Sequence, residues 1–184
     1  MRAFLIASIL ASATLLASDA PAPAPQFTAV NLLLRPEGYR EWVYLSSGLG
    51  MSYGGKSYDE HPDFTNVFIN PESYREFVKT GEFPERTVMV LEIRRSESSG
   101  SINKGGQYQN RLVGIEASVK DTKRFPEKWA YFGFIGPGGA PLPQAKAFSK
   151  DACWKCHAEH AAADNVFLQF YPALREAREK AATK

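Results

Sequence analysis

Five consecutive residues, Cys153-Trp154-Lys155-Cys156-His157, carry the most specific chemistry in this chain. Two thiols separated by two residues, with a histidine directly after the second, form the signature for attachment of c-type haem. Each thiol can add to one vinyl group of the haem, and the neutral imidazole that follows is a good ligand for the iron. We therefore predict one covalently attached haem c per chain, held by Cys153 and Cys156, with its iron ligated by His157.

Three other uses of the cysteine pair compete with haem attachment. Cys153 and Cys156 are the only cysteines in the chain, and two cysteines in an exported protein commonly form a disulfide. A thioredoxin-like redox pair would follow a strand early in its fold, whereas this motif lies near the C-terminus. A structural zinc site needs four ligands, and adding His157 and His160 would crowd all four into one short segment. The spacing and the adjacent histidine favour haem.

The sixth position on the iron separates electron carriers from ligand-binding haem proteins. Electron-transfer cytochromes usually place a methionine or histidine there, but no methionine follows His157 in the sequence. His160 lies three residues further on in the same helix and cannot reach the opposite face of the haem. Met51, Met89 and His61 remain, and Met89 suits core packing better. The sequence favours an open sixth position, and the alternative is a six-coordinate electron-transfer cytochrome c with a methionine ligand.

Apolar periodicity and capping signals predict the elements that position the motif. Strands are predicted at residues 63–69, 87–93, 109–119 and 129–135. Helices are predicted at residues 36–42, 71–80 with Asn70 as cap and Gly81 as stop, 151–162, and from 172 onward. This order predicts an α+β fold, in which an antiparallel β-sheet is packed with helices and the haem-bearing helix lies near the C-terminus.

Four phenylalanines in these strands are candidates for contact with the haem. Phe64 and Phe68 share one face of the first strand, and Phe132 and Phe134 share one face of the fourth, because strand side chains alternate with period two. We expect two of the four to touch the haem.

The N-terminal end has the pattern of a secretory signal peptide. Met1-Arg2 is followed by an uncharged apolar run and then by small residues, and the run is shorter than the ~20 residues that span a bilayer. We predict a signal peptide at 1–20, a Pro/Ala-rich spacer at 21–26 and a single haem domain at 27–184. Attachment of c-type haem outside the bacterial cytoplasm agrees with a periplasmic location. An uncleaved membrane anchor is the alternative.

The charge of the chain argues against a nucleic-acid partner. Its 22 basic residues nearly balance its 20 acidic residues, and no basic block is interleaved with aromatic residues.

Several stretches of the chain, in order, resemble cytochrome P-460 and its relative cytochrome c′-beta. They are residues 38–43, 70–74, 79–83, 114–121, 123–125, 129–132, 153–157, 166–167 and 170–172. The resemblance implies a periplasmic homodimer with a five-coordinate haem that is open on its distal side. It also implies chemistry on small nitrogen species, either hydroxylamine oxidation or nitric oxide binding, with a soluble cytochrome as electron acceptor.

Position 91 departs from the pattern of cytochrome P-460. That protein carries an extra covalent bond from a lysine to the haem edge, in a Thr-Val-x-Val-Lys stretch. Here Leu91 stands at the matching position, and no lysine lies between residues 87 and 93. Tyr131 or Tyr108 remains a formal substitute as a cross-linking residue. Because the cross-link accompanies hydroxylamine oxidation in the family, we expect weak or no hydroxylamine oxidoreductase activity.

Glu116 matches the distal carboxylate of the family, which takes a proton from hydroxylamine. A carboxylate beside an apolar haem face can have a raised pKa and act as a base. Ile115 and Ala117 are expected on the opposite face of the strand. Without the resemblance, a solvent-facing strand residue would be the simpler interpretation. With it, we predict that Glu116 is the catalytic residue.

Overall fold

The computed structural model describes residues 25–52 and 60–183, so the predicted signal peptide and residues 21–24 of the spacer lie outside it. Its main sheet has five antiparallel strands in the spatial order β2-β3-β4-β5-β6. They are β2 (Val43–Leu49), β3 (Asp63–Ile69), β4 (Val88–Glu97), β5 (Tyr108–Lys120) and β6 (Trp129–Gly133). A small second sheet pairs β1 (Leu33–Leu34) with β7 (Gln144–Ala145).

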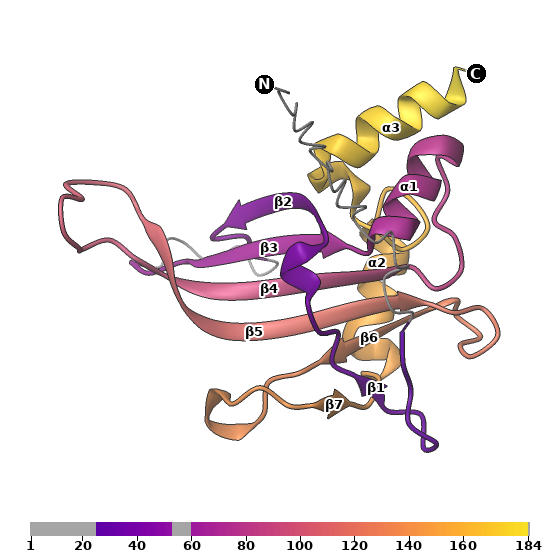
Figure 1. The fold of residues 1–184 in the computed structure, drawn as a ribbon, viewed down its shortest axis with the longest axis horizontal. Coiled ribbons are helices and arrows are strands. Elements are labelled where there is room, and N and C mark those ends of the chain that lie inside the picture. Colours follow the sequence, from indigo (N-terminus) through magenta and orange to yellow (C-terminus); the bar gives the residue numbers. More distant parts are fainter. Residues whose placement is uncertain (1–24, 53–59, 184) are drawn as a thin grey trace, which may run out of the picture.

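The helices gather toward one end of the main sheet (Figure 1). α1 (Pro71–Thr80) connects β3 to β4, and α3 (Pro172–Ala182) packs against it. The motif lies in a π-helical segment, η3 (Lys150–Trp154), that continues directly into α2 (Lys155–His160). Three 3-10 segments complete the fold: η1 (Tyr39–Glu41), η2 (Pro137–Gly139) and η4 (Leu168–Phe170). The predicted α+β class is confirmed. Within the described residues, no helix is long and apolar enough to cross a membrane.

The start of α1 differs from the prediction in one contact. Pro71 occupies the first turn, where its missing N–H leaves no bond unmade. Asn70 makes no side-chain capping bond to the described helix residues. Its Oδ1 instead accepts a hydrogen bond of 2.8 Å from the backbone N–H of Val88, which ties the start of α1 to β4. Gly81 ends the helix as predicted, with φ 76° and its N–H donating to the carbonyl of Phe77.

The strand boundaries agree with the sequence in the centre of the sheet and differ at its edges. β3 has the predicted limits, and β4 and β5 run further than predicted into a long hairpin that projects from the body (Figure 1). β6 ends at Gly133 rather than at residue 135, and the predicted helix at 36–42 is reduced to η1. β2 was not predicted, because Ser46, Ser47 and Gly48 weaken its apolar pattern.

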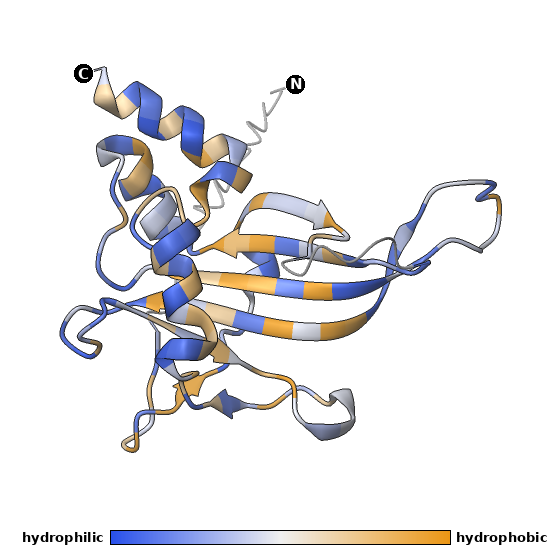
Figure 2. Ribbon diagram, turned by 180° about the vertical axis from the view of Figure 1, so that it is seen from behind, coloured by the Kyte–Doolittle hydropathy of each residue, from blue (hydrophilic) through white to orange (hydrophobic). Residues whose placement is uncertain are grey.

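The two faces of the main sheet carry separate hydrophobic clusters. We call one face the α2 face; its cluster includes Met89 and Tyr131. We call the other the β1 face; its cluster includes Val90 and Phe132. Cys153 and Trp154 pack against the cluster of the α2 face. Viewed from behind, α2 lies across the strands on this side (Figure 2). The haem motif is therefore placed over one face of the sheet, and only residues of that face are close to it.

The four phenylalanines expected at the haem lie on the other face. Phe132 and Phe134 are fully buried in the β1-face cluster, and Phe68 packs against it. Phe64 shares the side of Phe68 by period two. The prediction that two of them contact a haem beside Cys153 is therefore wrong. Periodicity shows which residues share a face, but it does not show which face a distant helix covers.

Candidate haem site

His157 has one ring nitrogen engaged and the other available. Its Nδ1 lies 2.8 Å from the backbone oxygen of Asn165. Because a carbonyl oxygen only accepts, Nδ1 carries the proton and Nε2 keeps its lone pair for a metal. Burial holds the pKa of His157 below its usual value, partly opposed by the hydrogen bond to Asn165. Neutral imidazole, the form that ligates iron, is therefore favoured.

Two aromatic rings fix the plane of this imidazole. The ring centroid of His157 lies 4.2 Å from that of Tyr131 and 4.5 Å from that of Phe167. Both aromatic side chains are buried. The hydroxyl of Tyr131 also donates a hydrogen bond of 3.1 Å to the carbonyl of Asn165. The same oxygen thus accepts from both Tyr131 and His157.

A tight turn places the carbonyl of Asn165. Asp164 and Asn165 have positive φ angles of 45° and 59°, and the N–H of Val166 donates to the carbonyl of Ala163 at 2.7 Å across the turn. Aspartate and asparagine tolerate this left-handed conformation better than most residues. Lys120 Nζ lies 2.6 Å from Asp164 Oδ2. This ion pair anchors the turn to β5.

The two cysteines are not bonded to each other in the structure, and both are half-buried. Burial raises the pKa of the Cys153 thiol, and the charge of Glu116 raises it further. Among residues 25–52 and 60–183, no group of three or more His, Cys, Asp or Glu side chains is arranged to hold a metal ion. His160 is exposed and its Nε2 lies 3.8 Å from Glu159. The geometry therefore gives no support to the four-ligand zinc alternative.

Glu116 lies on the α2 face, directly opposite Leu91 of β4 and Gly133 of β6. As predicted, Ile115 and Ala117 point the other way, into the β1-face cluster. The Glu116 side chain is accessible to solvent, yet the protein around it desolvates the carboxylate and raises its pKa above the usual value. These two observations describe a carboxylate in a recess that is open to solvent.

The surface around Glu116 suits a flat apolar group. A Cβ at Gly133 would lie 2.6 Å from Phe148 Cζ, so the phenylalanine ring lies directly over this glycine. Phe148 is still 43% exposed. Gly114 makes similar room for Ile93, whose Cδ1 would be 2.7 Å from an added Cβ. Together with the free thiols and the available Nε2 of His157, the part-exposed ring of Phe148 beside Glu116 gives this face side chains that suit a haem held by the motif.

The two methionines considered for the sixth position on iron have different surroundings. Met89 is 5% exposed and belongs to the hydrophobic core of the α2 face, in agreement with its predicted packing role. Met51 follows β2 and is 49% exposed. Its Sδ lies over Gly48, where an added Cβ would collide with it. Of the two, only Met89 lies in the cluster against which Cys153 packs.

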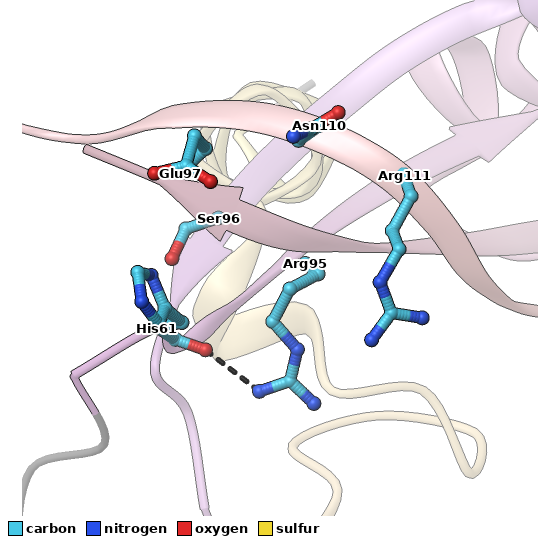
Figure 3. Close-up of a pocket in the computed structure, with 6 residues that line it drawn as sticks. All are labelled: His61, Arg95, Ser96, Glu97, Asn110 and Arg111. Atoms are coloured by element: carbon cyan, nitrogen blue, oxygen red, sulfur yellow. Dashed lines mark hydrogen bonds between the residues drawn. The ribbon is translucent and has the colours of Figure 1, made fainter. Parts of the chain in front are cut away.

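His61 lies in a separate cavity of about 340 Å³ that is lined by the segment before β3 and by residues of β4 and β5. Figure 3 shows its lining, which comprises His61, Arg95, Ser96, Glu97, Asn110 and Arg111. Arg95 donates to the backbone oxygen of His61 at 2.7 Å and pairs with Asp63. Val67 of β3 is the register partner of Leu91, which in turn pairs with Glu116. Asp63 precedes Val67 by four residues on β3, so Asp63 lies about 13 Å along the strand direction from Leu91 and Glu116. The cavity is therefore distinct from the surface around Cys153.

The chain matches the family model described as Cytochrome P460 over residues 36–168, a span that includes Glu116 and the whole motif. No curated protein matches the chain. The antiparallel sheet, the helices and the motif on one sheet face define a haem-binding cytochrome of mixed α and β structure. The chain belongs to the cytochrome P460 family, and this membership implies that it binds haem.

All four site residues named from the sequence lie on the same side of the sheet. They are Cys153, Cys156, His157 and Glu116. Phe148 and the carbonyl of Asn165 were not identified, and for the carbonyl the only available signal was the Asp-Asn pair, which favours a turn. Two tyrosines were considered for a covalent cross-link to the haem. The hydroxyl of Tyr131 donates a hydrogen bond to the backbone carbonyl of Asn165, whereas the hydroxyl of Tyr108 donates one to the backbone carbonyl of Ser99 in the projecting hairpin.

Proposed function

We propose that this chain is a periplasmic c-type mono-haem cytochrome that binds small nitrogen species such as nitric oxide, with weak or no oxidation of hydroxylamine. Cys153 and Cys156 would hold the haem covalently, and His157 would ligate the iron through Nε2. When bound, the haem supplies a coordination position for a small ligand and one-electron redox chemistry. The observation that carries the proposal is that Glu116 lies on the motif's side of the sheet, near Cys153, whose thiol pKa is raised by burial and then by the charge of Glu116.

The surroundings of His157 support its role as the proximal ligand. A ligating histidine usually donates its second N–H to a carbonyl or carboxylate, which fixes the tautomer and increases ligand basicity. The Nδ1 contact with Asn165 meets this requirement, and the rings of Tyr131 and Phe167 restrict rotation of the imidazole. These contacts hold the imidazole in the tautomer that leaves Nε2 free for iron.

Glu116 is suited to accept a proton from hydroxylamine. Its raised pKa brings the carboxylate closer to the operating pH, which is the condition for an efficient general base. The facing residue, Leu91, has no amine for a covalent bond to the haem edge and no positive charge to lower the pKa of Glu116. This pair supports ligand binding as the main activity and oxidation as a minor one.

The cellular setting belongs to the same proposal. Export to the periplasm is supported by the signal-like pattern of residues 1–20, and a homodimer and a soluble electron-acceptor cytochrome by the family resemblance. Fractionation of cells that express the full chain should place the processed protein in the periplasm. Sedimentation of the purified protein should give twice the monomer mass.

Optical absorption of the purified protein tests the function. The ferric and ferrous spectra should be high-spin, with a ferrous Soret band in the ordinary c-type region that changes when nitric oxide is added. Hydroxylamine with an electron acceptor should give little or no turnover. A low-spin spectrum with a methionine charge-transfer band would instead support the six-coordinate electron carrier, through Met89 or Met51. A strongly red-shifted Soret band with turnover would show a cross-linked hydroxylamine oxidase.

A further inference from the structure

One backbone oxygen, that of Asn165, connects two side chains that are far apart in the sequence. It accepts from His157 Nδ1 at 2.8 Å and from the Tyr131 hydroxyl at 3.1 Å. Tyr131 is 8% exposed, and its phenolic O–H can donate because the carbonyl oxygen of Asn165 can only accept. A carbonyl oxygen has two lone pairs and can accept both bonds.

The two donors compete for the same electron density. A hydrogen bond from Nδ1 to a carbonyl gives the imidazole partial anionic character and makes Nε2 a stronger ligand. A second donor on that carbonyl withdraws density from it, so the bond from Nδ1 becomes weaker. The Tyr131 hydroxyl therefore reduces the basicity that Asn165 confers on His157. Hydrogen bonding to the axial ligand is one of the means by which a protein sets the reduction potential of haem iron.

We infer that Tyr131 is a positioning residue that, through the carbonyl of Asn165, raises the reduction potential of the haem and weakens the bond between His157 and the iron. This inference rests on the proposed function, since it requires His157 to be the iron ligand.

The direct test replaces Tyr131 by phenylalanine in the holoprotein. Tyr131→Phe keeps the ring that packs on His157 and leaves the Asn165 carbonyl bonded to Nδ1, so the fold should be retained. We expect a more negative midpoint potential, with a change of about tenfold in the ferric-to-ferrous ratio at fixed potential, or about 59 mV for one electron. The stretching frequency of the iron–histidine bond in the ferrous protein, measured by resonance Raman spectroscopy, should rise.

Tyr74→Phe is the matched control. Tyr74 is a half-buried tyrosine packed against the same hydrophobic cluster, and its hydroxyl makes no hydrogen bond within the part of the chain that the structure describes. Its removal should change neither the potential nor the iron–histidine frequency. If Tyr131→Phe binds covalent haem but matches Tyr74→Phe in both measurements, the inference is overturned and the proposed function stands. If the wild-type protein carries no covalent haem, both are overturned.

Discussion

Leu91 and Glu116 are register partners on β4 and β5, and both side chains lie on the sheet face against which the haem motif packs. Side chains paired directly across antiparallel strands have Cβ atoms about 5 Å apart. The side chain at position 91 therefore lies next to the side chain of Glu116. Position 91 thus decides whether an apolar side chain or a charged amine stands beside Glu116.

Leu91→Lys tests whether the residue that faces Glu116 determines the haem spectrum and the hydroxylamine turnover. The variant places an amine where cytochrome P-460 carries its cross-linking lysine, and its positive charge should lower the pKa of Glu116. We expect the ferrous Soret band to move to longer wavelength and hydroxylamine turnover to increase. Leu91→Met keeps the site apolar and serves as control. Identical spectra for the two variants would show that residue 91 does not reach the haem edge.

Glu116→Gln tests the carboxylate as a proton acceptor. Any hydroxylamine turnover, in the wild type or in Leu91→Lys, should fall by about 10²-fold or more, because a positioned general base contributes a factor of this size. Nitric oxide binding should persist. In the parent protein the turnover should rise with pH through the raised pKa of Glu116, and this rise should be lost in the variant. Unchanged turnover would remove Glu116 from the site.

The same carboxylate should weaken the fold at neutral pH. Because burial raises the pKa of Glu116 in the folded state, the folded protein binds more protons than the unfolded chain at pH values between the two pKa values. Its contribution to stability therefore falls as pH rises through that range. In thermal unfolding, the melting temperature of Glu116→Gln should be higher than that of the wild type at neutral pH and close to it at low pH. A variant less stable than the wild type at neutral pH contradicts this.

A buried carboxylate on the opposite face should have the opposite pH dependence. Glu92 accepts hydrogen bonds from Tyr39 at 2.6 Å, from Arg40 at 2.8 Å and from Arg94 at 2.5 Å. Burial alone would raise the pKa of Glu92, but the bonds from Arg94, Tyr39 and Arg40 outweigh it and lower the pKa. Its stabilisation is thus present above the ordinary carboxyl pKa and is lost as pH falls through the lowered value.

Glu92→Gln should destabilise the protein by about 3 kcal/mol at neutral pH, because it leaves two arginines around a buried position without their counter-charge. Denaturant unfolding at several pH values gives this difference, which should shrink toward low pH. Glu37→Gln is the control: it breaks an exposed pair with Arg35, at 2.9 Å, and should change stability by less than about 1 kcal/mol. Equal effects of the two variants would show that the Glu92 network adds no more than a surface pair.

The left-handed turn at Asn165 supplies another test. Asn165→Val should destabilise the fold by about 1–2 kcal/mol, since a β-branched residue is strained at a φ of 59°. Asn165→Gly should remain close to the wild type, because glycine adopts this conformation freely and the carbonyl that bonds His157 is unchanged. Unfolding and haem content measure both effects. If glycine is as damaging as valine, the asparagine side chain matters more than the backbone.

Local signals in the sequence predicted the centre of the molecule well. β3 is rich in β-branched and aromatic residues and was placed at its observed limits, and α1 has a proline at its start and Gly81 at its end. The motif and Glu116 were found because their chemistry or family resemblance marks them. β2 was missed because serines and a glycine interrupt it, and a β-bulge between Tyr44 and Ser46 shifts its register.

The parts that could not be predicted depend on contacts between distant residues. Tyr131 and Asn165 are 34 residues apart, and only the packing of α2 against the sheet brings them together around His157. The error over Phe132 has the same origin, because the alternation of a strand leaves open which face a later helix covers. The π-helical start of the motif helix also has no local signature, because its residues are compatible with an ordinary helix.

Covalent attachment of haem to the motif is the central claim, and mass spectrometry tests it most directly. Protein expressed with the c-type maturation machinery should have the mass of the processed chain plus one haem. The peptide containing Cys153 and Cys156 should carry this added mass after acid extraction, and Cys153→Ala with Cys156→Ala should remove it. A peptide that has lost two hydrogens to a disulfide, or haem that acid extraction removes completely, would contradict the account.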